Sequence, residues 1–284
     1  MNSKPKKHLT DMSLQTITIN QWLGNATALL LQSGSKSARL DAQLLLCEVT
    51  KRNRAALLAH ENDCLDQKDQ NQLQALLKRR INHEPMAYIL KHQEFYGRTF
   101  KVNSDVLIPR PETETLVDEV IKLAKNSTGT LIDVGTGSGA IAITTKLELP
   151  KLNVFATDIS KKALDTARQN AKNLGSNIDF YQGNLLDDCT KKYDFIVANL
   201  PYVNPQWQRS PETNFEPSTA LFAEDNGLKL IKKLLSQSVT YLNAPGYIIL
   251  EADPCQHEEI TLYAKQNGLK LIKIVDYCVV LTNK

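Results

Sequence analysis

The strongest constraint on the fold of this 284-residue chain is a glycine-rich segment between a strand-like and a helix-like pattern. Its sequence is Asp133-Val134-Gly135-Thr136-Gly137-Ser138-Gly139, and we call it the glycine loop. Residues 130–134 before it read as a buried strand, and residues 140–149 after it read as a helix. Glycine lets the backbone turn tightly and approach a ligand closely. The segment therefore predicts a strand-to-helix turn, with or without a ligand above it.

Strand-like and helix-like patterns alternate from this point to the end of the chain. We predict strands at residues 130–134, 153–157, 178–181, 194–198, 247–251, 270–275 and 278–282. We predict helices at residues 140–149, 161–174, 228–242 and 257–267. Such alternation is typical of an α/β fold with a mostly parallel sheet and helices on both faces. Ligands of such sheets bind at the carboxyl ends of the strands.

The chain before residue 109 is organised differently. Residues from about 14 to 84 contain little Gly or Pro and carry apolar residues at helical spacing, which predicts a small helical bundle. Asp66 is placed to cap the clearest of these helices. Pro85 disfavours helical geometry at the residue before it, and Gly97 lies between strand-prone segments. We divide the chain into a helical domain at 1–84, a β-hairpin or linker at 85–108 and an α/β domain at 109–284.

Composition excludes several classes of protein. A net charge of only +3 gives no sign of nucleic-acid binding by itself, so such binding would need a local basic patch and is not expected. The 5 cysteines form no C-x-x-C pair and the 5 histidines no cluster, which predicts no metal site and a reducing, cytoplasmic location. No apolar segment follows Lys4, Lys6 and Lys7, so we expect a solvated tail there, with neither a secretory signal nor a membrane span.

Two further features follow the next strands of the predicted sheet. Asp158 ends the second strand, where a carboxylate can accept hydrogen bonds from ribose hydroxyls. After the third strand, Asn184 and Leu185 stand where they would bracket an adenine ring. The spacing G-x-G-x-G differs from the dinucleotide fingerprint G-x-G-x-x-G, and the P-loop lysine is absent. The three features together resemble the S-adenosylmethionine site of Rossmann-like methyltransferases, and a NAD site is the competing interpretation.

The fourth strand of the domain runs into Asn199-Leu200-Pro201-Tyr202, which we call the Asn199 loop. Asn and Pro are common in turns, so a simple strand end is one interpretation. The functional interpretation is methylation of a planar amide or amine nitrogen. The Asn199 side-chain oxygen and the Leu200 carbonyl would orient the NH₂ group and stabilise its developing positive charge. Pro201 favours extended geometry at Leu200, and the Tyr202 ring can pack on a planar group.

Nearly the whole chain resembles the HemK/PrmC family, the N5-glutamine methyltransferases of peptide chain release factors. The most specific match is Pro109-Arg110-Pro111-Glu112-Thr113-Glu114, which favours the release-factor enzymes over relatives that methylate a ribosomal protein. The other matches are Asp41-Ala42, Glu84–Tyr88, Glu94–Gly97, the glycine loop, Asp158, the Asn199 loop, Phe215-Glu216-Pro217, Ala220-Leu221 and Asp225–Leu228. A role in framing the active site is expected for Arg110, Glu112 and Glu114.

The resemblance implies a cytoplasmic, monomeric enzyme that methylates the glutamine of the Gly-Gly-Gln motif in class I release factors. S-adenosylmethionine would be its cofactor, and the helical domain would help to dock the release factor. The catalytic residues implied are Asn199, Leu200, Pro201 and Tyr202. The cofactor-binding residues implied are Asp133, Gly135, Thr136, Gly137, Ser138, Gly139, Asp158, Asn184, Leu185 and Asn199.

Three differences from the family pattern keep two alternatives open. Leu200 replaces a proline, Asn184 stands where an acid is common, and residues 275–280 look like a shortened final hairpin. One alternative is a nucleic-acid adenine N6-methyltransferase, because Asn-Leu-Pro-Tyr resembles the loop of rRNA adenine dimethyltransferases. The other is a module that binds release factor or cofactor without turnover.

Overall fold

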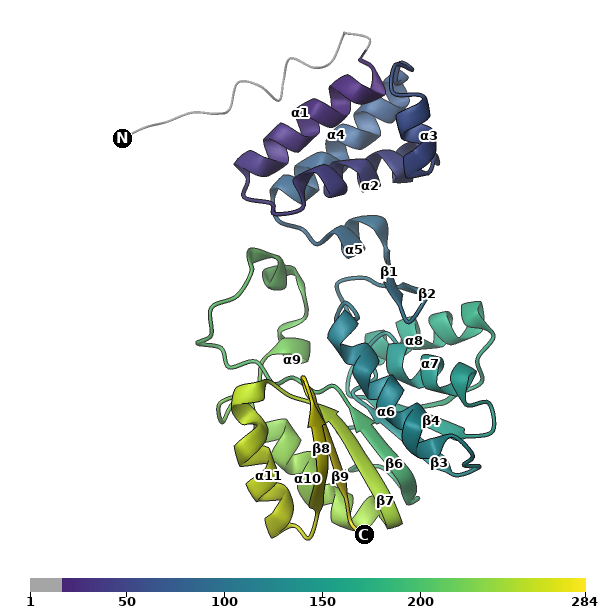
Figure 1. Ribbon diagram of the computed structural model, residues 1–284, viewed down its shortest axis with the longest axis vertical. Helices are drawn as coiled ribbons and strands as arrows, with labels where there is room; N and C mark the ends of the chain where they lie inside the picture. The colour runs from purple at the N-terminus through teal and green to yellow at the C-terminus, as the bar shows by residue number, and fades with distance from the viewer. Residues whose placement is uncertain (1–16) are drawn as a thin grey trace. The chain divides into compact units, whose positions relative to one another are not determined.

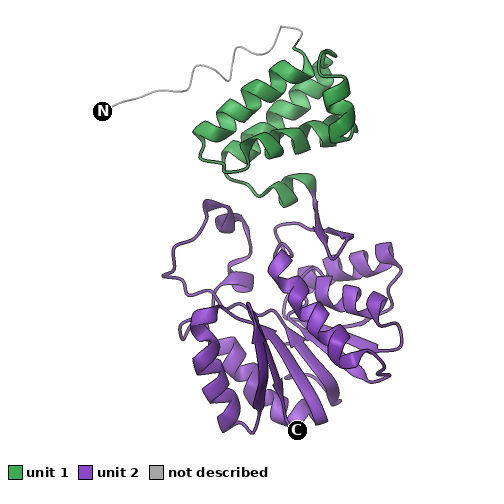
Figure 2. Ribbon diagram, in the orientation of Figure 1, with its two compact units in different colours: residues 1–90 green, residues 91–284 purple. Residues whose placement is uncertain are grey.

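The computed structural model describes residues 17–284, which form two compact units that divide between Leu90 and Lys91 (Figure 2). The division falls inside the segment that we had assigned to a hairpin or linker. The expected tail with Lys4, Lys6 and Lys7 lies outside the described residues. Across residues 17–284, every helix is too short or too polar to cross a lipid bilayer.

The first unit is a helical bundle, as its apolar spacing predicted. Its helices are α1 (Ile19–Gln32), α2 (Ala38–Thr50), α3 (Arg54–Ala59), α4 (Gln67–Ile81) and α5 (Met86–Leu90). The Asp66 side chain caps α4 by accepting a hydrogen bond from the Asp69 N–H at 2.7 Å, as predicted. Leu45 and Leu46 of α2 and Leu73 of α4 are fully buried in the shared core. Helix α5 was not predicted, because five residues are too few to show a period.

The second unit begins with a two-stranded hairpin, one of the two interpretations of residues 85–108. Strands β1 (His92–Phe95) and β2 (Arg98–Lys101) pair antiparallel across Tyr96 and Gly97. Both turn residues have positive φ angles, 52° and 68°, as a two-residue hairpin turn requires. The Tyr96 N–H donates to Glu114 Oε1 at 2.6 Å, so Glu114 holds the hairpin turn.

A seven-stranded sheet forms the centre of the second unit (Figure 1). Its strands are β3 (Thr130–Val134), β4 (Asn153–Asp158), β5 (Asp179–Gln182), β6 (Tyr193–Ala198), β7 (Leu242–Glu251), β8 (Lys270–Val275) and β9 (Cys278–Thr282). The helices are α6 (Glu114–Ala124), α7 (Ala140–Glu148), α8 (Lys161–Leu174), α9 (Ser218–Leu221), α10 (Lys229–Tyr241) and α11 (His257–Gln266). Helices α6, α7 and α8 cover one face, and α10 and α11 cover the other. The predicted α/β class is confirmed.

The strand order β5-β4-β3-β6-β7-β9-β8 places the site. Strands β3 to β7 are parallel. After β3 the chain adds β4 and β5 on one side of β3, and after β5 it crosses back to add β6 and β7 on the other side. The switch point therefore lies between β3 and β6, where ligands of open α/β sheets bind. Strand β9 inserts antiparallel between β7 and β8, so residues 275–280, which looked shortened, complete a hairpin at this edge of the sheet. Strand β7 begins at Leu242, earlier than the predicted residue 247.

Candidate active site

The glycine loop is tied to the end of the neighbouring strand β4. The N–H groups of Gly135 and Thr136 both donate to the Thr157 carbonyl at 2.9 Å. The Gly137 N–H donates to Asp158 Oδ2, also at 2.9 Å. These bonds fix a loop whose backbone lies open toward the switch point, which is the arrangement a small-molecule cradle requires.

Gly139, the last glycine of the loop, is required for helix packing. Its φ angle is +84°, and a Cβ atom there would lie 2.8 Å from Ile143 Cδ1 and 3.2 Å from Ala167 Cβ. Glycine thus allows α7 to start close to α8. The side of Gly139 where a Cβ would stand faces protein, so its contribution to the site is the path of the loop.

Asp133 lies below the loop and is fully buried. Its Oδ2 atom accepts hydrogen bonds from Thr136 Oγ1 at 2.6 Å and from the Ala142 N–H at 3.1 Å. Its Oδ1 atom has no hydrogen-bond partner within residues 17–284. Burial raises the pKa of Asp133 to about 7, although both hydrogen bonds oppose this shift.

The second and third sequence features meet the glycine loop at the same end of the sheet. Asp158 also accepts from the Ser160 N–H at 2.8 Å, and burial raises the pKa of its carboxyl group. Leu185 has a φ angle of +57°, which is uncommon for a residue with a side chain. Thr157 Oγ1 donates to the Leu185 carbonyl at 3.2 Å and holds this conformation. Asn184 beside it is exposed.

A cavity of about 520 Å³ opens at the switch point, large enough for a nucleoside-sized ligand and a side chain. Ten of the predicted site residues line it: Gly135, Thr136, Gly137, Ser138, Asp158, Asn184, Leu185, Asn199, Leu200 and Pro201. Asp133, Gly139 and Tyr202 lie outside this lining. The structure therefore brings the glycine loop, Asp158, the Asn184 turn and the Asn199 loop together around one cavity. Three of the predicted residues lie behind its lining.

Two residues that sequence reasoning missed hold the Asn199 loop. Asn199 Nδ2 donates to Thr113 Oγ1 at 3.0 Å, and Thr113 Oγ1 donates to Glu251 Oε2 at 2.6 Å. The Tyr202 hydroxyl donates to Glu251 Oε1 at 2.9 Å. Burial, followed by the nearby Glu251 carboxylate, raises the pKa of Tyr202, so its hydroxyl stays protonated. The sequence signals for them were the Pro-Arg-Pro-Glu-Thr-Glu segment, which contains Thr113, and the position of Glu251 at the end of an apolar strand.

The cavity wall is locked by a second buried acid. Glu216 accepts hydrogen bonds from the Arg110 guanidinium and from the Ile108 N–H, the latter at 3.2 Å. Its side chain is 1% exposed, whereas that of Arg110 is 38% exposed. This ion pair ties residues 104–109 to residues 217–222, and both segments line the cavity. Of the acids expected to frame the site with Arg110, Glu114 holds the hairpin turn and Glu112 is exposed.

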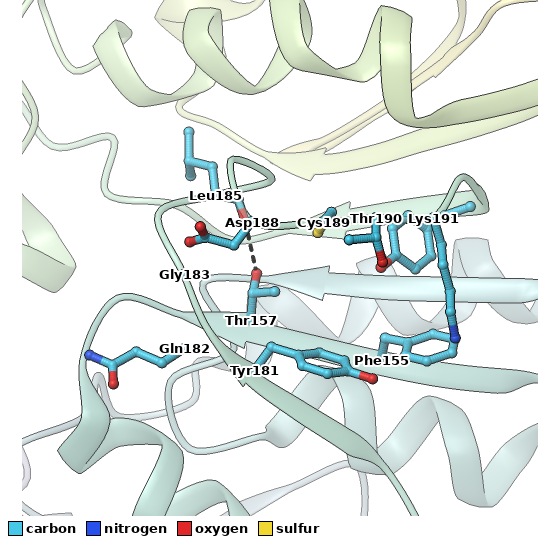
Figure 3. A pocket seen from close by; sticks show the side chains of 11 residues that line it. Phe155, Thr157, Tyr181, Gln182, Gly183, Leu185, Asp188, Cys189, Thr190 and Lys191 are labelled. Atoms are coloured by element: carbon cyan, nitrogen blue, oxygen red, sulfur yellow. Dashed lines mark hydrogen bonds between the residues drawn. The ribbon is translucent and has the colours of Figure 1, made fainter.

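A smaller cavity lies beside the Asn184 turn and shares Gly183 and Leu185 with the larger one (Figure 3). The Phe155 and Tyr181 rings stack at 6.2 Å between centroids, and Lys191 Nζ lies 4.9 Å above the Phe155 ring. Since these groups contact one another, the cavity is narrow. Within residues 17–284, no cluster of His, Cys, Asp or Glu is arranged to hold a metal ion.

Family models match part of each unit. Residues 21–90 match the family model of the PrmC N-terminal domain, and residues 113–214 match that of the methyltransferase small domain. A release factor glutamine methyltransferase of Neisseria gonorrhoeae is 37% identical over 91% of this chain and 93% of its own length. That of Coxiella burnetii is 40% identical over 85% of this chain and 88% of its own.

Solved structures share the fold over about two thirds of the chain. A methyltransferase from Pyrococcus furiosus is similar with a TM-score of 0.51 and 16% identity, over 66% of this chain and 90% of that one. The 16S rRNA N2 G1207 methyltransferase of Thermus thermophilus was solved with AdoMet and guanosine. It is similar with a TM-score of 0.52 and 13% identity, over 68% of this chain and 49% of that one.

Fold and site together define a Rossmann-like methyltransferase that uses S-adenosylmethionine. The open glycine loop, the Asp158 carboxylate and the size of the cavity fit that cofactor. More particularly, the chain belongs to the release factor glutamine methyltransferase family.

Proposed function

We propose that the chain transfers the methyl group of S-adenosylmethionine to the side-chain amide nitrogen of the glutamine in the Gly-Gly-Gln motif of class I release factors. The observation that carries this proposal is the orientation of Asn199. Its Nδ2 atom donates a hydrogen bond to Thr113, and no group within residues 17–284 donates a hydrogen bond to its Oδ1 atom. An unused carbonyl oxygen beside the cofactor cradle is the acceptor that an amide NH₂ group needs. The names of the relatives above support the same substrate.

An amide nitrogen is a poor nucleophile, because its lone pair is delocalised into the carbonyl group. Asn199 Oδ1 and the Leu200 carbonyl would accept its two hydrogens, hold the nitrogen in line with the methyl donor and stabilise its developing charge. Bound S-adenosylmethionine supplies a sulfonium methyl group as the electrophile. The N–C bond forms as the S–C bond breaks, and the methylated nitrogen then loses one proton to solvent.

No strong general base is required, and Tyr202 does not act as one. Its hydroxyl already donates to Glu251, and its pKa is raised. Tyr202 lies behind the cavity lining, and its hydrogen bond to Glu251 instead holds the Asn199 loop in place. We assign cofactor binding to eight cavity-lining residues, with Asp133 and Gly139 supporting them: Gly135, Thr136, Gly137, Ser138, Asp158, Asn184, Leu185 and Asn199.

The proposal extends to partners and location. The helical unit would dock the release factor, and the enzyme would act as a monomer. A substrate that takes part in translation places the reaction in the cytoplasm. The modest net charge of +3 suits a protein substrate better than a nucleic acid.

Mass spectrometry tests the proposal directly. The protein is incubated with S-adenosylmethionine and a class I release factor, and the Gly-Gly-Gln peptide is then isolated. We expect one added methyl group on the glutamine. A parallel reaction with rRNA and labelled cofactor should remain unlabelled. Label in rRNA alone would favour the adenine methyltransferase, and tight binding without transfer would favour the inactive module.

A further inference from the structure

Glu251 is a buried acid beside the site that no sequence motif marked. It ends strand β7, is 2% exposed and uses both carboxylate oxygens. Oε2 accepts from the Thr113 hydroxyl at 2.6 Å, and Oε1 accepts from the Tyr202 hydroxyl at 2.9 Å. A buried carboxylate is costly unless it is hydrogen-bonded, so these contacts stabilise the fold around it. They also reach two residues next to the reacting groups.

The single proton of the Thr113 hydroxyl makes the arrangement directional. An ionised carboxylate only accepts hydrogen bonds, so Thr113 must give its proton to Glu251. Its oxygen can then only accept from Asn199, which must present Nδ2 toward it. The Asn199 side chain is planar, so its Oδ1 atom points the other way. Thr113 and Asn199 both line the cavity, where the substrate amide would lie.

We propose that Glu251 is a positioning residue, which acts through Thr113 to keep Asn199 Oδ1 turned toward the substrate and through Tyr202 to hold the Asn199 loop. The inference rests on the proposed function. A protonated Glu251 would allow the opposite order: it would donate to Thr113, and Thr113 would donate to Asn199 Oδ1. Asn199 would then present an NH₂ group to the substrate NH₂ group, and the two donors would repel.

The charge state of Glu251 follows from its surroundings. Burial raises its pKa above the usual range, and the Glu112 carboxylate raises it further. Hydrogen bonding by the side chains of Thr113, Tyr202 and Asn199 lowers it. Across the sheet, Cys278 on β9 pairs with Glu251, and burial raises the pKa of that thiol to about 12. Cys278 and Tyr202 are therefore neutral near pH 7, so of these three groups Glu251 is the one that loses its charge as pH falls.

Two substitutions of Thr113 distinguish the effect of its hydroxyl group from the effect of its side-chain volume. Thr113→Val removes the hydroxyl and keeps the volume, so kcat for release factor should fall by about 10²-fold. Thr113→Ser keeps the hydroxyl, so kcat should stay within about threefold of wild type. The Kd for S-adenosylmethionine should change little in either variant. Thr145→Val is the matched control, because the Thr145 hydroxyl is buried and makes no hydrogen bond in the described chain.

A spectroscopic readout tests the arrangement without any turnover. Selective ¹⁵N-asparagine labelling reports the Asn199 side-chain NH₂ resonances, which are assigned by their loss in Asn199→Asp. We expect these resonances to shift with pH as Glu251 titrates, and to lose that pH dependence in Glu251→Gln. The fall of kcat toward acid pH should be smaller in the same variant than in wild type, and Asp133 and Asp158 account for what remains of it.

The outcomes are separable. Full kcat in Thr113→Val, or Asn199 resonances indifferent to both substitutions, would overturn the positioning role. A wild-type protein that methylates no release factor, but whose Asn199 resonances follow Glu251, would overturn the proposed substrate and leave the positioning role intact.

Discussion

Leu200 packs directly on Gly135, so that a Cβ atom on Gly135 would lie 3.0 Å from Leu200 Cδ2. Leu200 is 4% exposed, and Gly135 has a φ angle of +75°. The contact joins the loop expected to hold the substrate amide to the loop expected to hold the cofactor. Proline in place of Leu200 would have a shorter side chain on the same backbone carbonyl. In this chain the glycine loop and the Asn199 loop are thus in direct contact, so a change in one should affect the other.

The first prediction concerns this contact. Gly135→Ala should weaken S-adenosylmethionine binding at least about tenfold, the equivalent of about 1.4 kcal/mol. The added methyl group is strained at positive φ and also presses on Leu200. Gly175→Ala is the matched control, since Gly175 has a φ angle of +67° and open space around it. Gly175→Ala should introduce the same backbone strain and leave the affinity for S-adenosylmethionine unchanged.

Calorimetric titration of the cofactor measures both variants. In the double variant Gly135→Ala/Leu200→Ala, part of the lost affinity should return, because the side chain under pressure is removed. Equal defects in Gly135→Ala and in the double variant would show that the contact does not couple the loops.

The second prediction concerns Asn199. Asn199→Ala should lower kcat for release-factor methylation by about 10²- to 10³-fold, because it removes an acceptor for the developing charge. Cofactor affinity should remain within about twofold, since the glycine loop and Asp158 are untouched. Asn173→Ala on the exposed face of α8 is the control and should change neither quantity. Unchanged turnover in Asn199→Ala would refute the assigned role.

The third prediction concerns the Arg110–Glu216 ion pair in the cavity wall. Arg110→Met leaves the buried Glu216 carboxylate with only the Ile108 N–H, so unfolding free energy should fall by about 1.5–3 kcal/mol. The release-factor KM should rise, because two segments of the wall are no longer tied. Lys162→Met breaks the exposed pair with Asp105 and should have little effect on stability.

Urea unfolding and steady-state kinetics measure these two effects. The double variant Arg110→Met/Glu216→Gln should recover much of the stability, since the uncompensated charge is gone. A KM that stays at the wild-type value in Arg110→Met would show that the wall is held by other contacts.

The fourth prediction is a pH dependence of stability that arises from Asp133. Its folded pKa of about 7 lies above that of an unfolded aspartate, so the folded protein holds a proton that the unfolded chain releases. Stability should therefore fall as pH rises from about 4 to about 7, by up to about 1.4 kcal/mol per pH unit. Asp133→Asn should flatten this slope.

Urea midpoints at about pH 5 and about pH 8 give the comparison. The control Asp179→Asn alters an exposed carboxylate and should keep the wild-type slope. A slope in Asp133→Asn equal to that of wild type would show that Asp133 is ionised throughout the range.

The sequence was most informative where periodicity and caps act locally. Strands β3, β8 and β9 and helix α8 have the bounds that their patterns predicted. Short or irregular elements were missed for the same reason. Helices α5 and α9 span too few residues to show a period, and β7 starts inside a segment that contains Pro245. Local pattern therefore defines the sheet and leaves the segments around the cavity mouth undetermined.

Part of the candidate site was likewise predictable from local sequence, and part of it was not. Its motifs lie at the ends of strands, and parallel pairing brings strand ends together, so their meeting was predictable. The contact of Thr113 with Glu251 joins residues 138 positions apart and depends on side-chain packing that no local pattern encodes. Asp133, Gly139 and Tyr202 were grouped with the lining residues, because sequence position does not distinguish a cavity wall from the layer behind it.

The placement of β9 between β7 and β8 has a consequence for how the molecule is made. Every residue of β9 is buried, and β8 has β9 as its neighbour in the sheet. A ribosome produces residues 270–275 before residues 278–282, so β8 emerges with no strand to join. Until β9 arrives, the nascent chain presents the open edge of β7, which is the kind of surface through which growing polypeptides pair wrongly.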